Sequence, residues 1–288
     1  MSTAPHLFIA PADMLAWSTA QRLAGRTIGF VPTMGALHEG HLALIGEARN
    51  RADVVVVSIF VNPLQFNRRD DFDHYPRPID GDLDACRAAR VDAIYAPTAA
   101  TMYPPHFQTH VSPGELALPL EGADRPGHFR GVTTVVAKLF NAVRPDTAVF
   151  GQKDYQQLVV IRQMAADLDM GIDIIAAPTV REPDGLALSS RNRRLSAEQR
   201  DAARCVPAAL DAIENQTKLG VTDTASLREV GFDVFRAQPL ARADHIQLVN
   251  AQTLQPLITL DPVTLVVLAV WFGEIRLIDN RLIQLIGA

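Results

Sequence analysis

Two histidines, His38 and His41, flank a Glu-Gly step in the segment VPTMGALHEGHLALI, residues 31–45. A strand-like run ends just before Gly35, which allows a tight turn, and a helix is expected to begin near His41. A strand followed by a glycine turn and a helix presents unpaired backbone N–H groups and the positive end of a helix dipole to an anion. The segment therefore predicts a phosphate site in which both imidazoles donate to phosphate oxygens.

Two other interpretations of the histidine pair stay open. His38 could be a solvated helix cap and His41 a half-buried helix residue, with no ligand bound by either. A metal site is the other alternative, but the zinc-protease signature H-E-x-x-H needs histidines four residues apart, and HEGH is one residue short. The glycine turn favours phosphate over both alternatives.

Polar side chains also follow two other strand-like runs. Asn62 and Gln65 come after the run 53–61, and an amide can both donate to and accept from a polar organic acid. Lys153 and Asp154 come after the run 147–151. A lysine beside a helix N-terminus is a point charge for phosphate, and Asp154 could cap the helix or bind a metal or a ribose hydroxyl. The alternatives are a turn-stabilising asparagine and a solvated lysine.

Three further segments carry residues suited to anion or metal binding. Hydroxyl and guanidinium groups in the loop SSR, residues 189–191, could clamp a phosphate, or the loop could be a solvated basic helix start. Arg125, His128 and Arg130 lie in a Gly/Pro-rich loop that could hold a carboxylate or order a subunit interface. Most carboxylates between residues 70 and 84 are expected to be solvated, although a magnesium role is open because Mg²⁺ needs only one or two carboxylates.

The composition excludes several classes of protein. The 288 residues are 48% hydrophobic and carry a net charge of −5, which argues against binding nucleic acid by general electrostatics. The two cysteines form no CxxC pattern, so a reducing compartment is expected. No secretory signal is expected at the N-terminus, and the longest apolar runs are too short for a membrane span. These features predict a soluble, cytoplasmic protein.

Alternation of strand-like and helix-like runs predicts βαβ units and a parallel sheet. The expected strands cover residues 27–33, 53–61, 91–97, 147–151 and 171–178, and the expected helices cover residues 41–52, 79–90, 131–143 and 154–168. After about residue 180 two helices and three strands predict a smaller α+β domain. We therefore expect a Rossmann-like α/β domain over residues 1–179 that binds its ligand at the carboxyl ends of the strands. A C-terminal α+β domain over residues 180–288 would close over the active site.

The segment PTMGALHEGH resembles the HxGH-type signature of the nucleotidyltransferase superfamily. Over its ten residues it is similar to the pantoate–β-alanine ligase (pantothenate synthetase) family, and FVNPLQF, FGQKDYQQL and SSRN resemble further motifs of that family. The resemblance implies ATP-dependent condensation of pantoate with β-alanine through a pantoyl adenylate. It also implies that residues 1–179 bind ATP and pantoate, that Mg²⁺ accompanies ATP, and that the protein is a homodimer.

The resemblance also implies roles for individual residues. The catalytic groups would be His38, His41, Lys153, Ser189 and Arg191. The ATP contacts would add Pro32, Met34, Gly35, Gly151, Asp154, Val180, Leu188 and Ser190 to these five residues. The contacts to pantoate or β-alanine would be Met34, Asn62, Gln65, Gln157, His128 and Arg130. Asp82 would be the metal ligand, although the family's adjacent acidic pair is interrupted here as Asp-Gly-Asp. A second departure from the family pattern is Leu188, which stands where methionine is frequent.

Three alternative functions remain at this point. A nucleotidyltransferase that moves AMP or CMP onto a phosphate-bearing acceptor would need a second basic pocket where this chain has Gln65 and Gln157. A synthetase that charges tRNA conflicts with the acidic balance and lacks a lysine-rich signature loop. A non-catalytic nucleotide sensor would keep the phosphate contacts without turnover.

Overall fold

The computed structural model describes residues 4–285 and divides into two compact units. The first unit contains residues 1–152 and 156–178, and the second contains residues 153–155 and 179–288. The chain therefore contributes residues 153–155 to the second unit, returns to the first unit, and belongs to the second unit again from residue 179 on.

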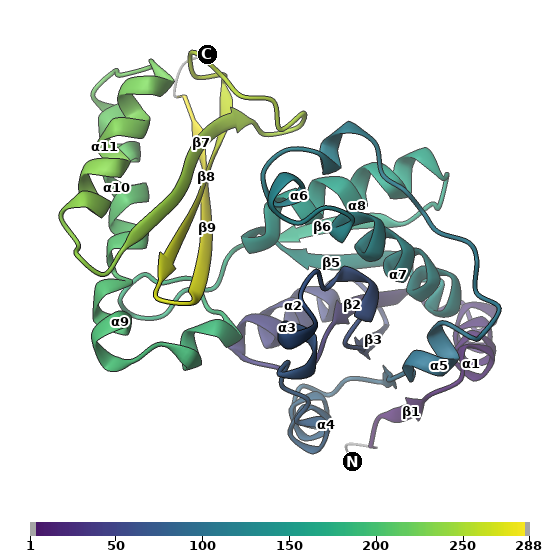
Figure 1. Cartoon of the computed structure of the whole chain (residues 1–288). Helices are drawn as coiled ribbons and strands as arrows, with labels where there is room; N and C mark the ends of the chain where they lie inside the picture. The colour runs from purple at the N-terminus through teal and green to yellow at the C-terminus, as the bar shows by residue number, and fades with distance from the viewer. Residues whose placement is uncertain (1–3, 286–288) are drawn as a thin grey trace. The chain divides into compact units, whose positions relative to one another are not determined.

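A six-stranded parallel sheet forms the centre of the first unit, in the order β1-β4-β3-β2-β5-β6 (Figure 1). Its strands are β1 (His6–Phe8), β2 (Ile28–Thr33), β3 (Val54–Ile59), β4 (Ala93–Tyr95), β5 (Thr147–Gly151) and β6 (Asp173–Ala177). From β2 the chain adds strands on one side and then, from β5, on the other. Open parallel sheets bind ligands where this direction reverses, at the carboxyl ends of the strands. Here that place is the adjacent pair β2 and β5.

Helices connect the strands of the first unit. They are α1 (Pro11–Leu23), α2 (Glu39–Arg49), α3 (Arg69–Asp73), α4 (Ile79–Ala88), α5 (Ala99–Met102), α6 (Glu121–Asp124), α7 (His128–Val143) and α8 (Tyr155–Asp167). Three short 3-10 turns are η1 (Pro63–Gln65), η2 (Glu115–Ala117) and η3 (Gln152–Asp154).

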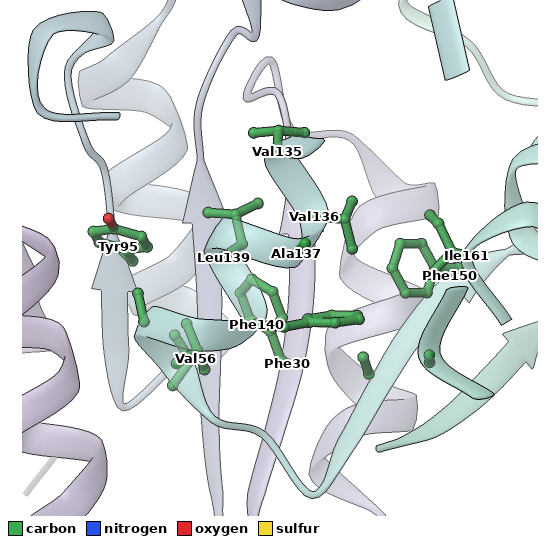
Figure 2. Packing of buried hydrophobic residues seen from close by; sticks show 14 of the residues in the cluster. Phe30, Val56, Tyr95, Val135, Val136, Ala137, Leu139, Phe140, Phe150 and Ile161 are labelled. Carbon is green, nitrogen blue, oxygen red and sulfur yellow. The ribbon is translucent and has the colours of Figure 1, made fainter. Parts of the chain in front are cut away.

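Both faces of the sheet are covered, which explains the uninterrupted apolar run of β3. Val54 and Val56 pack into one core with residues of α1, α7 and α8, whereas Val55 and Val57 pack into another with residues of α2 and α4. Successive side chains of a strand point to opposite faces, so a strand that is covered on both faces is apolar throughout. Phe140 of α7 lies between the sheet residues Phe30 and Phe150 in the first of these cores (Figure 2).

The second unit packs two helices against a three-stranded antiparallel sheet of order β7-β8-β9. Its elements are η4 (Ser190–Arg194), α9 (Ala197–Ala202), α10 (Cys205–Lys218), α11 (Thr224–Arg236), β7 (Arg242–Asn250), β8 (Val263–Phe272) and β9 (Ile275–Gln284). Gly231 of α11 would place a Cβ 2.7 Å from Ile246 Cδ1 of β7, so a glycine allows this close packing of helix on sheet.

The predicted fold class is confirmed, and the five predicted strands of the parallel sheet all form. The start of α7 was predicted wrongly. Helix α7 begins at His128, not at Gly131, so His128 and Arg130 lie in its first turn rather than in a loop. Ser190 and Arg191, which were predicted in a loop or at a basic helix start, lie on the 3-10 turn η4. Strand β1 was not predicted, because three residues at a sheet edge carry too little pattern.

Among the described residues, no helix is long and apolar enough to cross a membrane.

Candidate functional site

The predicted histidine pair forms the N-terminus of α2. Nδ1 of His38 accepts a hydrogen bond from the Gly40 backbone N–H at 3.1 Å, and Nδ1 of His41 accepts from the His38 backbone N–H at 3.3 Å. The two rings lie with their centroids 4.1 Å apart. The two side chains thus cap the helix reciprocally, as serine and glutamate do in a capping box.

These two hydrogen bonds define the tautomer of each ring. A nitrogen that accepts an N–H bond carries no proton, so the proton of the neutral ring is on Nε2 in both His38 and His41. Each neutral ring therefore carries its N–H donor on Nε2. This is the chemistry predicted for phosphate oxygens, and it combines the cap and the donor in one side chain.

The loop that leads to these histidines is held by Asp82 of α4. Oδ2 of Asp82 accepts from the Ala36 N–H at 2.9 Å and Oδ1 accepts from the Leu37 N–H at 2.7 Å. The Asp82 residue is only 2% exposed. A Cβ on Gly35 would lie 2.7 Å from Oδ2, so the loop can pass this carboxylate only with glycine there. A magnesium ion at Asp82 would compete with both loop amides; the metal role stays a prediction.

After the carboxyl end of β3, Asn62 caps the turn η1, Gln65 ends it, and the two side chains contact each other. Nδ2 of Asn62 donates to Gln65 Oε1 at 2.9 Å and to the Gly131 carbonyl at 3.1 Å. Nε2 of Gln65 donates to Met34 Sδ, 3.3 Å away in the loop after β2. Three predicted substrate contacts, Met34, Asn62 and Gln65, are thus brought together from two neighbouring strands.

The backbone of Gln65 is fixed as firmly as its side chain. Its carbonyl accepts from His128 Nδ1 at 2.8 Å and from Arg125 Nη2 at 3.0 Å. His128 is 7% exposed, and its Nδ1 must donate because a carbonyl only accepts. His128 was predicted to contact substrate, which stays a prediction. The structure shows that its ring holds the Gln65 carbonyl.

Helix α7 approaches η1 very closely at Gly131. A Cβ on this residue would lie 2.3 Å from the Leu64 carbonyl oxygen and 2.8 Å from the Gln65 nitrogen. No side chain fits at such distances, so glycine is required for the Gly131 carbonyl to reach Asn62.

Five predicted ATP contacts lie in the second unit after residue 179: Val180, Leu188, Ser189, Ser190 and Arg191. The Leu188 N–H donates to the Val180 carbonyl at 2.9 Å, which places these two predicted ATP contacts side by side. Ser189 caps η4, because its Oγ accepts from the Arg191 N–H at 3.3 Å. The predicted hydroxyl and guanidinium groups therefore belong to one turn.

Asn192 and an ion-pair cluster fix that turn. Nδ2 of Asn192 donates to Glu182 Oε1 at 2.8 Å and to the Ala187 carbonyl at 3.0 Å. Arg200 pairs with Glu182 and with Asp184, each at 2.6 Å. Its hydrogen bond to Asp184 is the largest cause that raises the pKa of Arg200, and the same bond lowers the pKa of Asp184.

Lys153 is anchored by strand β9. The Asn280 side chain is 8% exposed and donates through Nδ2 to the Lys153 carbonyl at 2.8 Å. The preceding residue, Asp279, binds Arg181 in a two-point ion pair of 2.6 and 3.0 Å. Two adjacent residues of β9 thus hold both places at which the chain enters the second unit.

The remaining predicted residues are placed as follows. Pro32 lies on β2 and Gly151 ends β5; Asp154 is exposed on η3, Gln157 is half-buried on α8, Ser190 begins η4 and Arg130 is exposed on α7. Their contacts to ligands stay predictions. Sequence reasoning missed two supporting residues: Tyr103, whose hydroxyl donates to Asn62 Oδ1 at 2.7 Å, and Asn280. Each is far in sequence from the residue it holds. Asn192 was included only as the last residue of the SSRN motif, without a supporting role.

A sequence profile of the pantoate-beta-alanine ligase family matches residues 6–282 of the chain. The pantothenate synthetase of Geotalea daltonii is 50% identical over 271 residues, which cover 94% of this chain and 96% of that protein. The pantothenate synthetase of Geobacter sulfurreducens is 51% identical over 269 residues, which cover 93% of this chain and 95% of that protein.

Two solved structures are similar to the whole chain. The crystal structure of pantothenate synthetase from Thermus thermophilus has a TM-score of 0.90 at 44% identity, and it covers 96% of this chain and 98% of its own. Pantoate-beta-alanine ligase from Francisella tularensis, complexed with beta-gamma ATP and beta-alanine, has a TM-score of 0.80 at 34% identity, with 97% and 98% covered.

Replacing Asp82 with asparagine tests the loop clamp. The amide keeps one acceptor but turns an N–H₂ group toward a backbone N–H, so we expect a loss of about 1–3 kcal/mol in the free energy of unfolding by urea. The control is Asp84→Asn on the same helix, whose side chain is 72% exposed, and which should change stability by less than about 0.5 kcal/mol. Equal stabilities of the two variants would contradict the clamp.

Replacing Gly131 with alanine tests the close approach of α7 to η1. The new methyl group must displace the Leu64 carbonyl, so we expect destabilisation of about 1–3 kcal/mol in urea unfolding. Gly46→Ala is the matched control, because a Cβ on this exposed residue of α2 meets nothing within 4 Å. It should stabilise the protein by about 0.5–1 kcal/mol through helix propensity. A neutral Gly131→Ala would show that the backbones are farther apart.

Proposed function

Because the chain belongs to the pantoate-beta-alanine ligase family, we propose that it ligates pantoate to β-alanine in two steps that consume ATP. A pantoate carboxylate oxygen attacks the α-phosphorus of ATP, the bond to the bridging oxygen breaks, and pyrophosphate leaves. The β-alanine amine then attacks the acyl carbon of the pantoyl adenylate. AMP leaves, the nitrogen loses a proton, and pantothenate is released.

The observation that carries this proposal is the set of N–H donors at the carboxyl ends of β2 and β3. His38 and His41 present Nε2–H groups, and Gln65 presents an amide N–H₂ held by Asn62. Negative charge builds on phosphate oxygens during adenylation, so preorganised donors stabilise the transition state without reorganisation. The remaining work is orientation of two substrates, which can supply roughly 7–11 kcal/mol.

The individual roles follow the predicted assignment. His38, His41, Lys153, Ser189 and Arg191 contact the phosphates of ATP, and Gln65 and Gln157 hold pantoate. Mg²⁺ bound with ATP would neutralise phosphate charge, and Asp82 is the residue predicted to hold it. A cytoplasmic location, a homodimer and closure of the second unit over ATP belong to the same proposal. The Francisella tularensis structure supports ATP and β-alanine as substrates, because that protein is complexed with beta-gamma ATP and beta-alanine.

Isotope exchange between pyrophosphate and ATP tests the reaction. We expect exchange only when pantoate is present, and release of pantothenate and AMP only after β-alanine is added. Exchange that requires a different small acid would identify that acid, instead of pantoate, as the substrate. Transfer of AMP to a phosphate-bearing acceptor would support a nucleotidyltransferase. Binding of ATP without any turnover would indicate a nucleotide sensor.

Replacing Lys153 with alanine tests the phosphate contact. Loss of one preorganised charge stabilisation costs about 2.7–4 kcal/mol, so exchange should slow by roughly 100- to 1000-fold. Lys218→Ala is the control, because this lysine is exposed on α10 and pairs only with Glu214 in the described contacts. Normal exchange by Lys153→Ala would overturn the role.

For His38, asparagine separates the cap from the donor. Asparagine is a good N-cap, so His38→Asn should keep the stability of α2, whereas His38→Ala should lose about 1 kcal/mol. Both variants lack the Nε2–H donor and should slow exchange by roughly 100- to 1000-fold. The measurements are urea unfolding and pyrophosphate exchange. An active His38→Asn would show that the ring serves only as a cap.

A further inference from the structure

The orientation of the Asn62 amide is decided by two backbone groups. The Gly131 carbonyl lies 3.1 Å from one terminal atom and can only accept, so that atom is Nδ2. The Leu64 N–H lies 3.3 Å from the other terminal atom and can only donate, so that atom is Oδ1. Asn62 is 1% exposed, and reversing its amide would leave both backbone groups facing like partners.

This orientation propagates to Gln65. The Gln65 atom that lies 2.9 Å from Asn62 Nδ2 has to accept a hydrogen bond, so it is Oε1. The N–H₂ group of Gln65 is then the end that points toward Met34, at 3.3 Å from its sulfur. A thioether is a weak acceptor, so an anionic or hydroxyl oxygen of a ligand is a much better partner for this N–H₂ group.

Tyr103 completes the chain of hydrogen bonds at its far end. Its hydroxyl lies 2.7 Å from Asn62 Oδ1 and must donate, because that oxygen only accepts. Phe60 and Phe107 hold the Tyr103 ring, with centroid distances of 6.1 and 5.0 Å. Burial raises the pKa of Tyr103 well above its usual range, so the hydroxyl keeps its proton at the pH values at which the enzyme would work.

We propose that Tyr103 is a positioning residue for the acid substrate: through Asn62 it holds the Gln65 amide with its N–H₂ group toward the oxygen atoms of the hydroxy acid. This inference rests on the proposed function, since it assumes that Gln65 holds pantoate. It assigns Gln65 a donor role, which favours a carboxylate or hydroxyl oxygen over an N–H donor at that position of the substrate. It also makes Asn62 an intermediary.

Tyr103→Phe is the direct test, because it removes one oxygen atom and keeps the ring that packs on Phe60 and Phe107. Asn62 Oδ1 then retains only the longer bond from Leu64 N–H. We expect kcat/KM for pantoate to fall by about 5- to 100-fold, mainly through KM, while KM for ATP stays within about twofold. A purely structural role would change both substrates alike. Equal changes for both, or an unchanged KM for pantoate, would overturn the proposal.

Tyr95→Phe is the matched control. Tyr95 is a second buried tyrosine of the same unit, 1% exposed, and its hydroxyl makes none of the hydrogen bonds to Asn62 that the structure describes. Removal of its hydroxyl should leave KM for pantoate within about twofold, because no contact of Gln65 changes. A rise in KM equal to that of Tyr103→Phe would overturn the proposal, because any buried tyrosine would then have the same effect.

A double-mutant cycle with Gln65→Ala shows through which residue Tyr103 acts. If Tyr103 acts through Gln65, adding Tyr103→Phe to Gln65→Ala should reduce kcat/KM for pantoate by less than about twofold. Additive losses would overturn the proposal. The wild-type exchange assay is scored first. If the enzyme adenylates another small acid, the proposed substrate fails and the same cycle is measured with that acid. If no acid is adenylated, the positioning role fails with the function.

Discussion

The site of the first unit depends on one buried carboxylate. Asp82 accepts from two successive backbone N–H groups, those of Ala36 and Leu37. The loop there contains Gly35 at φ +79° and Ala36 at φ +52°. A left-handed conformation costs an alanine roughly 1–2 kcal/mol, and charge-assisted hydrogen bonds are strong enough to offset this cost. The loop then delivers His38 to the N-terminus of α2 in the orientation that caps it.

The parallel sheet converts this local geometry into a binding edge. Strands β2 and β3 pair in register from Ile28 with Val54 to Thr33 with Ile59, so both strands end at the same level. Met34 and Gln65, which follow these ends, therefore meet across 31 positions of sequence. Cores on both faces prevent the strands from sliding. The precision of the edge thus derives from valines that are buried on both faces of the sheet.

Much of the fold and the outline of the site follow from sequence, because apolar runs and the polar residues after them are local signals. His38, Asn62 and Gln65 were each predicted to follow a strand, and parallel strands end at the same edge of a sheet. Supporting contacts could not be predicted in this way. Tyr103 lies 41 positions from Asn62 and Asn280 lies 127 positions from Lys153, so only tertiary packing brings them together.

The boundary of α7 and the task of Asp82 illustrate two other limits. Glycine has a low helix propensity, so the sequence predicts no helix before Gly131. In the structure the helix extends back to His128, because the missing side chain of Gly131 lets it pass close to η1. Asp82 stands among several similar carboxylates between residues 70 and 84. Nothing local distinguishes a carboxylate that receives loop amides from one that receives solvent or a metal ion. Burial decides, and burial is a property of the folded chain.

Three side chains of the first unit share the same hydrogen-bond polarity. The acceptor atoms of three side chains are occupied from within the protein: Nδ1 of His38, Nδ1 of His41 and Oε1 of Gln65. Each of these side chains therefore carries its polar hydrogen on the other terminal nitrogen, as an N–H donor that is complementary to the oxygen atoms of carboxylates and phosphates. Gln65 is 8% exposed, and reversing its amide would leave a buried donor facing the Asn62 donor, at a cost of about 1–3 kcal/mol. The free energy of folding thus maintains a donor array before any substrate binds, and a preorganised array requires no reorganisation when charge develops on phosphate.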